Sequence, residues 1–499
     1  MASISSIITG AFNQKNKAEN QFKNLDNEAN IEWIEKEKLI FNDEDFHFNF
    51  GRSVSIDGNY AVIGQNGYIG GAAHIYKKNG SKWIHQTQIL PGNDEFNKHF
   101  GNSVSIEGDT VLIGESSQGY PYHTDYGSAY VFKKDINGQW NQVSKLSPTK
   151  GCINDFFGCS VSLSKDTALI GASGDNIKGA DTGSAYIFKY NGTGWHQKEM
   201  LIPNDSGWGD NFGISVSLDG DTALIGSLSD NEKGSAYIFK YNGTKWNQEA
   251  KLIPSNSTNY LMFGYSVSLD GNTALIGAPG NYKNTGSAFI FKYNGNLWVQ
   301  QAKLNISSQA AYDHFGISVS IDGDTALIGE TDSDFVYVFK RYGSKWNKEA
   351  KLYSSDDSSY KGFGCSVSID EDTAFIGAEN DRKNGSLSGA AYIYLRDKTN
   401  PYVKIINPKS AIYLAGKVIT PYFFPVIVGN IEIQATAEDD LEIERLEFYI
   451  NDEYIANCTE DPYIFLWNEI SFGKYTINAV AYDSVGKIGE DILTVLKFF

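Results

Sequence analysis

Residues 212–254 read "FGISVSLDGDTALIGSLSDNEKGSAYIFKYNGTKWNQEAKLIP", the clearest copy of a unit that recurs along the chain. Four short runs in it predict strands, namely "SVSL", "TALIG", "GSAYIFKY" and "WNQEAKL". Asp-Gly after the first run and Asn-Gly after the third predict tight hairpin turns, because these residues tolerate positive φ. Four strands in a unit of about 50 residues predict one blade of a β-propeller.

The same unit recurs along the chain, and two markers allow it to be counted. Its head, Phe-Gly-x-Ser-Val-Ser, occurs seven times, starting at Phe50, Phe100, Phe157, Phe212, Phe263, Phe315 and Phe363. The Trp that opens the fourth strand also occurs seven times, at Trp33, Trp83, Trp140, Trp195, Trp246, Trp298 and Trp346.

The two markers are out of step at the ends of the repeat region. The last head is followed by three strand-like runs and no Trp, whereas Trp33 lies in "IEWIEKEKLI" (31–40), ahead of the first head. We therefore expect the N-terminal segment to supply the outer strand of the last blade and to cover its open edge. The predicted fold class is all-β: a seven-bladed propeller closed by an N-terminal strand, followed by an immunoglobulin-like (Ig-like) β-sandwich.

This interpretation divides the chain into four parts. Residues 11–30 are polar and rich in Asn and Lys, so residues 1–30 are expected to form a flexible N-terminal segment. The propeller is expected at 31–396 and a linker at 397–401. Residues 402–499 hold no Phe-Gly head but contain seven alternating strand-like runs, which predict the Ig-like sandwich. Its core is expected around Trp467, Tyr475 and the run "INAVAYD".

The repeat "FGxSVSIDGDTALIGA…GSAYIFKYNG" resembles the FG-GAP repeat, in particular its bacterial and archaeal variety. The C-terminal part, with "LEFYINDEYIAN", resembles the Ig-like modules of microbial surface proteins. FG-GAP propellers also form the heads of integrin alpha subunits, where some blades bind calcium through a long Asp-rich loop between the first two strands. Here that connection is a short turn such as "DGN", "EGD" or "DGD". Such turns are too short to supply the ligands that calcium needs, so no metal site and no cofactor are predicted.

Composition narrows the possible partners. The net charge of −18 argues against nucleic-acid binding and against docking on anionic membranes. The acidity suits either solubility or a cationic partner. No apolar run is long enough to span a membrane, and the N-terminus does not have the pattern of a secretory signal. The family resemblance nevertheless implies an extracellular or cell-surface location.

The four cysteines do not identify a redox compartment. Cys159 and Cys365 occupy the same position in two different repeats, so they are expected to lie apart and unpaired. Cys152 and Cys159 could pair across a loop, and the sequence leaves this open.

Alternating strand direction sorts the loops of every blade onto two faces. The hairpins between strands one and two and between strands three and four share one face and are nearly uniform. The loops between strands two and three and between blades share the other face and vary in length, as in many binding sites. That face is rich in aromatic residues, whose rings suit sugars or protein hot spots. The candidate ligand-binding residues are Tyr120, Tyr122, Tyr126, Trp208, Tyr260, Tyr282, Tyr312 and Tyr360. The alternative is that these rings only cover the mouth of the propeller.

Other polar residues give little support for catalysis. Asp155, Asp210 and Asp313 each stand two residues before a Phe-Gly head. They could form a ring of carboxylates, but capping of backbone amides is the preferred interpretation. His99 and His314 share the position directly before the head, and no nucleophile elbow, Cys-x-x-Cys or phosphate loop is present.

The sequence therefore predicts a non-enzymatic recognition or adhesion protein. Its variable-loop face would bind a glycan or a protein, and the Ig-like domain would serve as spacer or anchor. Two alternatives stay open: a polysaccharide-active enzyme that uses the propeller funnel, and a structural module of a larger surface assembly.

Overall fold

The computed structural model describes residues 32–41, 49–67, 71–91, 99–116, 126–255, 260–280, 286–306, 314–356, 361–382 and 388–499. The described chain forms two compact units, Trp33–Leu395 and Arg396–Phe499. Apart from one short 3-10 turn, η1 (Asp230–Glu232), every described element is a β-strand. The prediction of an all-β protein is confirmed.

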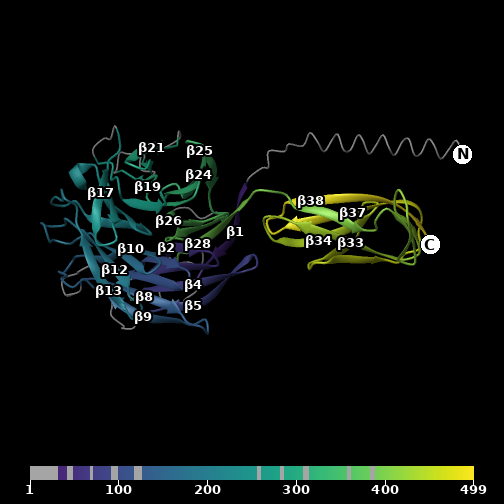
Figure 1. Ribbon diagram of the computed structural model, residues 1–499, viewed down its shortest axis with the longest axis horizontal. Helices are drawn as coiled ribbons and strands as arrows, with labels where there is room; N and C mark the ends of the chain where they lie inside the picture. The colour runs from purple at the N-terminus through teal and green to yellow at the C-terminus, as the bar shows by residue number, and fades with distance from the viewer. Residues whose placement is uncertain are drawn as a thin grey trace. The chain divides into compact units, whose positions relative to one another are not determined.

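The first unit consists of seven sheets of four antiparallel strands (Figure 1). The first strands of the blades are β2 (Asn49–Asp57), β6 (Phe100–Glu107), β10 (Phe157–Ser164), β14 (Phe212–Asp219), β18 (Ser266–Asp270), β22 (Val319–Asp322) and β26 (Phe363–Asp370). The second strands are β3 (Tyr60–Asn66), β7 (Thr110–Glu115), β11 (Thr167–Ala172), β15 (Thr222–Ser227), β19 (Thr273–Ala278), β23 (Thr325–Glu330) and β27 (Thr373–Ala378).

The outer half of each blade follows the predicted order. The third strands are β4 (Ala72–Asn79), β8 (Ser128–Lys134), β12 (Ser184–Tyr190), β16 (Ser235–Tyr241), β20 (Ser287–Tyr293), β24 (Phe335–Tyr342) and β28 (Ala390–Asp397). In the first six blades the fourth strands are β5 (Lys82–Ile89), β9 (Trp140–Leu146), β13 (Trp195–Leu201), β17 (Trp246–Leu252), β21 (Trp298–Leu304) and β25 (Lys345–Leu352).

The seventh sheet takes its outer strand from the N-terminal part of the chain. Its order is β1-β28-β27-β26, with β1 (Glu32–Leu39) hydrogen-bonded to β28 (Figure 1). The indole Nε1 of Trp33 in β1 donates a hydrogen bond of 2.9 Å to Glu349 of the sixth blade. Whether this strand holds the ring closed is a matter of stability, and that part of the prediction stays a prediction.

The Phe and Gly of each head serve packing. All seven Phe side chains are fully buried, and Phe157 packs edge-on against Tyr186 of the third strand with ring centroids 5.4 Å apart. The Gly lets two blades approach each other closely. Gly51 has φ +88°, and a Cβ at this position would lie 2.1 Å from the carbonyl oxygen of Ala390. Any other residue at this position would therefore strain the backbone and collide with the neighbouring blade.

The two serines of each head join neighbouring blades. The hydroxyl of the first Ser donates to the carbonyl of the head Gly in the next blade at 2.6 to 2.9 Å, from Ser53, Ser103, Ser160, Ser215, Ser266, Ser318 and Ser366. The hydroxyl of the second Ser accepts a backbone N–H from the next blade at 2.9 to 3.2 Å. Both series include the junction between the seventh and the first blade.

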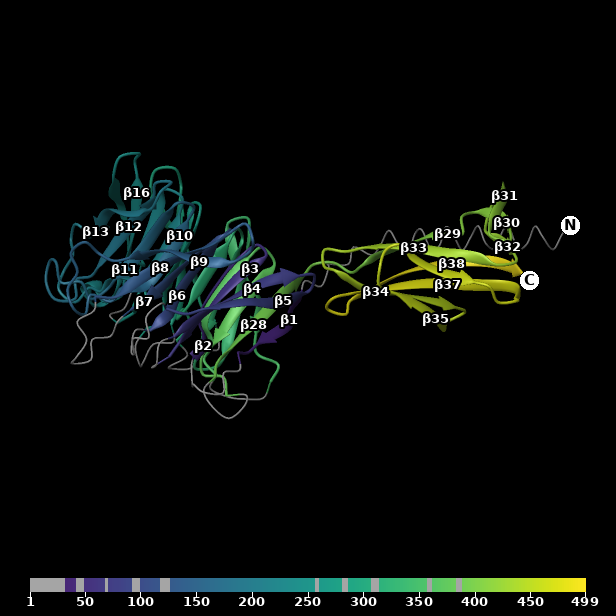
Figure 2. The same cartoon turned by 90° about the horizontal axis from the view of Figure 1, so that it is seen from below.

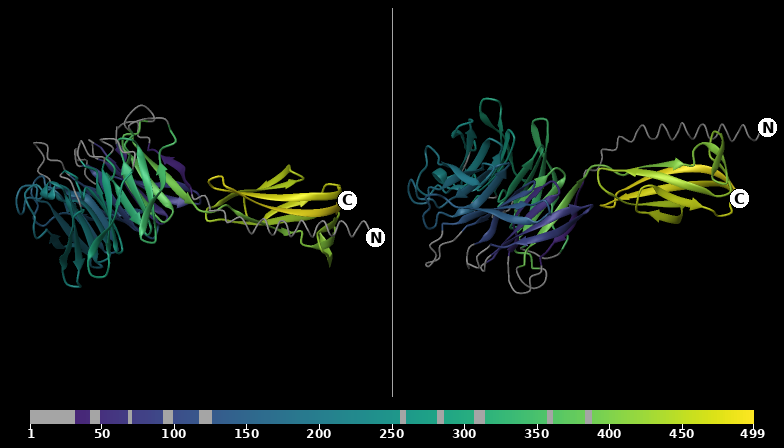
Figure 3. Two further views of the ribbon diagram at one scale, coloured as in Figure 1. Left: turned by 90° about the horizontal axis from the view of Figure 1, so that it is seen from above. Right: turned by 60° about the horizontal axis from the view of Figure 1, so that its bottom comes forward.

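The hairpin between strands one and two adds a third series of bonds between blades. Its acidic residue accepts a backbone N–H from the same turn of the next blade, as in Asp57 to Gly108 at 2.5 Å and Asp370 to Gly58 at 2.6 Å. Ser164 takes this role at the third blade, where the turn reads "SKD". The repeat motif thus encodes the contacts between blades, and Figure 3 shows the sheets of this unit side by side in two further views.

The second unit is a β-sandwich. One sheet has the order β29-β33-β36 and the other β31-β30-β32-β38-β37-β34-β35 (Figure 2). Its strands are β29 (Tyr402–Asn407), β30 (Ala411–Leu414), β31 (Lys417–Pro421), β32 (Val426–Val428), β33 (Ile431–Glu438), β34 (Ile443–Ile450), β35 (Glu453–Cys458), β36 (Tyr463–Trp467), β37 (Phe472–Asp483) and β38 (Ile488–Phe498).

The predicted core of the sandwich is confirmed, but its strand count was too low. Trp467 is buried in the core, Tyr475 packs 5.3 Å from it, and Ile477, Ala479 and Ala481 lie in the same core. The sequence predicted seven strands and missed β30, β31 and β32. Pro421, Pro425 and the exposed positions of β31 weaken the strand pattern in that segment.

Candidate functional site: an axial cavity in the propeller

The third residue of every Phe-Gly head reaches the propeller axis. Arg52, Asn102, Cys159, Ile214, Tyr265, Ile317 and Cys365 all line one cavity of about 930 Å³. Residues at or just after the ends of the second strands, such as Asn66, Ser173 and Asn380, complete the lining. Because first strands begin and second strands end at this edge of the blades, the cavity lies on the variable-loop side of the propeller.

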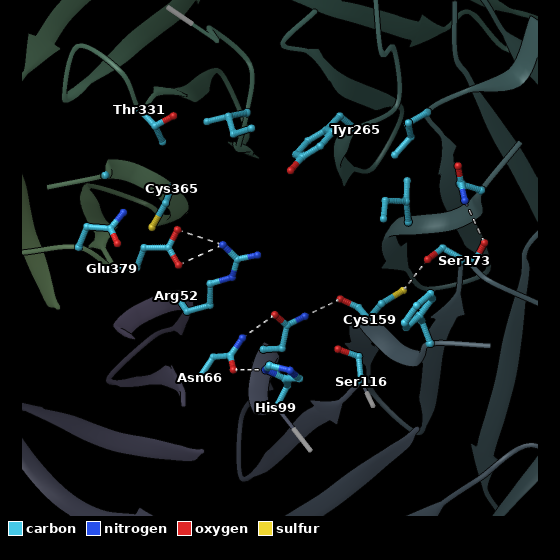
Figure 4. Close-up of a pocket in the computed structure, with 18 of the residues that line it drawn as sticks. Arg52, Asn66, His99, Ser116, Cys159, Ser173, Tyr265, Thr331, Cys365 and Glu379 are labelled. Carbon is cyan, nitrogen blue, oxygen red and sulfur yellow. Dashed lines mark hydrogen bonds and ion pairs between the residues drawn. The ribbon is translucent and has the colours of Figure 1, made fainter. Parts of the chain in front are cut away.

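One wall of the cavity, from the seventh, first and second blades, is polar. Arg52 Nη1 donates to both carboxylate oxygens of Glu379, at 3.0 and 3.1 Å. His99 Nδ1 lies 2.7 Å from Asn66 Oδ1, and the Asn66 amide donates to Asn102 at 3.1 Å. Figure 4 shows these side chains gathered on one side of the open space.

The opposite wall, from the fourth to the sixth blade, has more apolar surface. It presents Ile214, Leu228, Ile317 and Tyr265, the one aromatic residue among the seven head positions that line the cavity. Figure 4 shows Tyr265 across the cavity from Arg52 and Glu379. Asn211 and Asp332 add polar groups to this half; Asp332 accepts a hydrogen bond of 2.6 Å from His314. The cavity is therefore amphipathic.

The electrostatics of the polar wall centre on Arg52. Burial opposes its charge, but the carboxylate of Glu379 outweighs this and the pKa of Arg52 is raised. Burial, together with the charge of Arg52, lowers the pKa of His99, so its imidazole is neutral at pH 7. The side chains of the lining that carry a formal charge are Arg52, Glu379 and Asp332.

The two cavity cysteines are not suited to nucleophilic chemistry. Burial raises the pKa of the Cys159 thiol, and burial with the Glu379 charge raises that of Cys365 to about 12. A thiol is a good nucleophile only as the thiolate, which these sites disfavour. All four cysteines of the chain are free, so Cys152 and Cys159 do not pair in this structure.

The aromatic residues predicted from the sequence lie elsewhere or cannot be placed. Tyr126, Trp208 and Tyr260 are exposed in the loops of the predicted face, and none of them lines the cavity. Tyr120, Tyr122, Tyr282, Tyr312 and Tyr360 lie outside the described residues. A role of these eight residues in binding stays a prediction.

The sequence missed the residues that line the cavity, although a signal was present. The third position of the head varies from Arg to Ile while its neighbours stay constant. A variable position inside an otherwise constant motif indicates a side chain that the scaffold leaves free.

The capping interpretation of the aspartates is confirmed where it can be checked. Asp155 accepts the backbone N–H of Cys152 and Asp210 that of Gly207, both at 2.5 Å. Neither lines the cavity, and Asp313 lies outside the described residues.

In the part of the chain that the structure describes, no three His, Cys, Asp or Glu side chains form a metal-binding group. No helix within the described ranges is long and apolar enough to cross a membrane.

The fold and the site define a seven-bladed β-propeller joined to an Ig-like domain, with a preformed cavity on the propeller axis. The FG-GAP repeat matches residues 33–76, 83–132, 140–188, 195–239, 246–291, 298–339 and 346–394. These ranges cover more than half of the chain, which therefore belongs to the FG-GAP repeat family. A bacterial Ig domain matches residues 401–479.

The family match also explains why Trp33 precedes the first Phe-Gly head. Every matched unit begins at the Trp of a fourth strand and ends in the third strand of the following sheet. The repeat in the sequence thus spans two sheets, and β1 is the beginning of the first repeat rather than a detached tail.

Similarity to individual proteins is limited. No curated protein matches the chain. The fibronectin(III)-like modules of CbhA from Clostridium thermocellum share 27% identity, covering 19% of this chain and 96% of that chain, with a TM-score of 0.16. A protein from Lactobacillus plantarum shares 12% identity, covering 63% of this chain and 87% of that chain, with a TM-score of 0.40. The combination of FG-GAP repeats with an Ig-like domain is of the surface and adhesion type, and both families are typically non-catalytic.

Proposed function

We propose that this protein is a non-enzymatic recognition protein of the cell surface or the extracellular space. It binds a glycan or a protein on the variable-loop side of the propeller, and the axial cavity is its principal binding site. The observation that carries this proposal is the amphipathic lining of the cavity, with side chains of all seven blades facing one space. Concave sites with apolar walls and a few placed polar groups are typical of ligand binding.

The rigidity of the lining supports binding. The polar side chains are already held by one another, and their backbones are fixed by the bonds between blades. A preformed site loses less conformational entropy when the ligand binds. The two acidic groups of the lining are engaged with Arg52 and His314, which favours a binding role over acid-base catalysis.

The remaining parts of the proposal rest on the family. The Ig-like domain would serve as spacer or anchor. We place the protein outside the cell because members of both families are commonly extracellular. Fractionation of the source cells checks the location: recovery of the protein only in the cytosol would contradict it.

The proposal is tested with the labelled full chain on arrays of glycans and of cell-surface proteins. We expect the wild type to bind and a Tyr265→Ala, Arg52→Gln double variant to lose binding. The triple variant Tyr120→Ala, Tyr122→Ala, Trp208→Ala tests the outer loops in parallel. Recovery with a stable partner subunit and no binding on either array would contradict the proposal and favour the structural-module alternative.

A further inference from the structure

We propose that the axial cavity takes a neutral saccharide, with a sugar ring lying on Tyr265 and its hydroxyl groups turned to Arg52. This inference rests on the proposed function and narrows it to one ligand class. A pyranose ring is itself amphipathic, since its faces carry C–H groups and its rim carries hydroxyls. A ligand of this kind matches a cavity that has one polar wall and one more apolar wall.

The apolar wall supplies the stacking surface. Tyr265 is half-buried, lines the cavity, and its hydroxyl makes no hydrogen bond to any described residue. Ile214 and Ile317 occupy the equivalent positions in the two adjacent blades, so the ring is flanked by aliphatic surface on both sides. Aromatic rings with a polar tip suit ligands that have apolar faces and polar edges.

The polar wall supplies open donors. Of the guanidinium nitrogens of Arg52, only Nη1 has a hydrogen-bond partner among the described residues. The side chain is 41% exposed, so its Nε and Nη2 hydrogens remain available on the cavity side. Glu379 fixes the orientation of the group without covering these donors. A pair of adjacent sugar hydroxyls would accept from them.

Charge separates neutral from acidic saccharides. Glu379 balances Arg52, and Asp332 leaves the lining with a net negative charge. A carboxylate or sulfate on the ligand would enter a lining whose formal net charge is already negative, and it would have to compete with Glu379 for Arg52. The cavity therefore selects against acidic sugars, in spite of its arginine.

Size agrees with the terminal part of a glycan. Pockets for small ligands typically have volumes of about 300 to 1,000 Å³, and this cavity has about 930 Å³. It accommodates one or two sugar rings, with the remainder of the chain leading out toward the variable loops.

The experiment screens the full chain on a glycan array that holds matched neutral and acidic oligosaccharides, followed by calorimetry on the best ligand. We expect neutral glycans to bind. Tyr265→Ala should weaken binding at least about tenfold and Tyr265→Phe less than about threefold, because the ring provides the stacking surface. Arg52→Gln should weaken it about tenfold. Tyr342→Ala, an exposed Tyr of the opposite face, is the matched control and should leave affinity unchanged.

A change of specificity gives a readout that a structural role would not produce. Glu379→Gln removes one negative charge and should allow acidic saccharides to bind. Thermal melting of each variant verifies that the propeller is folded. If the wild type binds only proteins, or prefers acidic glycans, the saccharide inference is wrong while the proposed function stands. If neutral glycans bind equally to Tyr265→Ala, the site is wrong. If nothing binds, both proposals fail.

Discussion

The third and the seventh blade have the same strand arrangement, but the acidic residues after their second strands have different surroundings. In both, a buried Asp follows the second strand and accepts a hydrogen bond of 2.7 Å from the Tyr hydroxyl of the third strand. These pairs are Asp175 with Tyr186 and Asp381 with Tyr392. What surrounds them differs.

In the seventh blade two lysines offset the acidic groups. Lys38 of β1 lies 2.6 Å from Asp356 and 2.8 Å from Asp381, and the buried Lys361 also pairs with Asp356. The fourth blade has a similar arrangement, with Lys251 between Asp205 and Asp230 at 2.6 and 2.5 Å.

In the third blade both lysine positions are changed. Met200 pairs with Tyr186 in the strand register, where Lys251 pairs with Tyr237 in the fourth blade. Asp155 stands two residues before the head Phe, as Lys361 does in the seventh blade. Asp155 is buried, and one of its carboxylate oxygens has no hydrogen-bond partner among the described residues. Among the described residues, neither carboxylate of the third blade pairs with a cation, whereas lysines pair with the acidic groups of the fourth and seventh blades.

The largest effect is expected from removing residues 1–40, which deletes the outer strand of the seventh blade together with Lys38. The buried Trp33 and Leu39 are lost and Asp381 loses a partner, so the free energy of unfolding should fall by more than about 5 kcal/mol. The uncovered edge of β28 should also promote aggregation. Denaturant unfolding and size-exclusion chromatography measure both effects. Deletion of residues 1–30 is the control, and equal melting of both deletion variants would contradict a closing role for β1.

A single substitution, Lys38→Met, gives the seventh blade the residue of the third. Asp381 is fully buried, and the substitution removes its ion pair with Lys38, which is costly for a buried carboxylate. We expect a loss of about 3 kcal/mol, read from the denaturant midpoint. Lys198→Met, at an exposed position of β13, is the control and should change stability little. A loss equal to that of the control would show that Lys361 alone balances the site.

The reverse change, Met200→Lys, gives the third blade the residue of the fourth. At pH 8 the new ammonium group should pair with Asp175 and raise stability by about 1 to 2 kcal/mol. Thermal melting of the variant beside the wild type at pH 8 measures this gain. Destabilisation at pH 8 would contradict the new ion pair with Asp175.

The smallest effect concerns pH. Burial raises the pKa of Asp155 from 3.8 to about 6; the Asp175 charge adds to the shift and the Cys152 amide opposes it. Because the folded state binds this proton more tightly than the unfolded chain, the contribution to stability is full below the ordinary value and is lost as the pH rises through about 6. Asp155→Asn should therefore be more stable than the wild type above pH 6 and lose that advantage toward pH 4. Parallel melting curves at every pH would contradict this.

Much of the fold could be predicted from the sequence because the signals are local and repeated. Asp-Gly and Asn-Gly turns, apolar second strands and the Trp count defined the blades and placed β1 with the last one. The segment 411–428 was missed because its prolines and exposed residues break the alternation. The cavity was missed because nothing in a single repeat reveals that its third head residue faces the axis.

The seven blades, the Ig-like sandwich and its core follow from the amino-acid sequence alone, since strand pattern and turn chemistry act over a few neighbouring residues. Which side chains meet depends on the folded arrangement of the blades. Arg52 reaches Glu379 of the last blade, and Lys38 reaches Asp381 across most of the chain. These contacts depend on the angle between successive blades and on the packing of the seventh blade against the first. That angle arises from the Gly, Ser and Asp contacts between neighbouring sheets, and one repeat alone does not make these contacts.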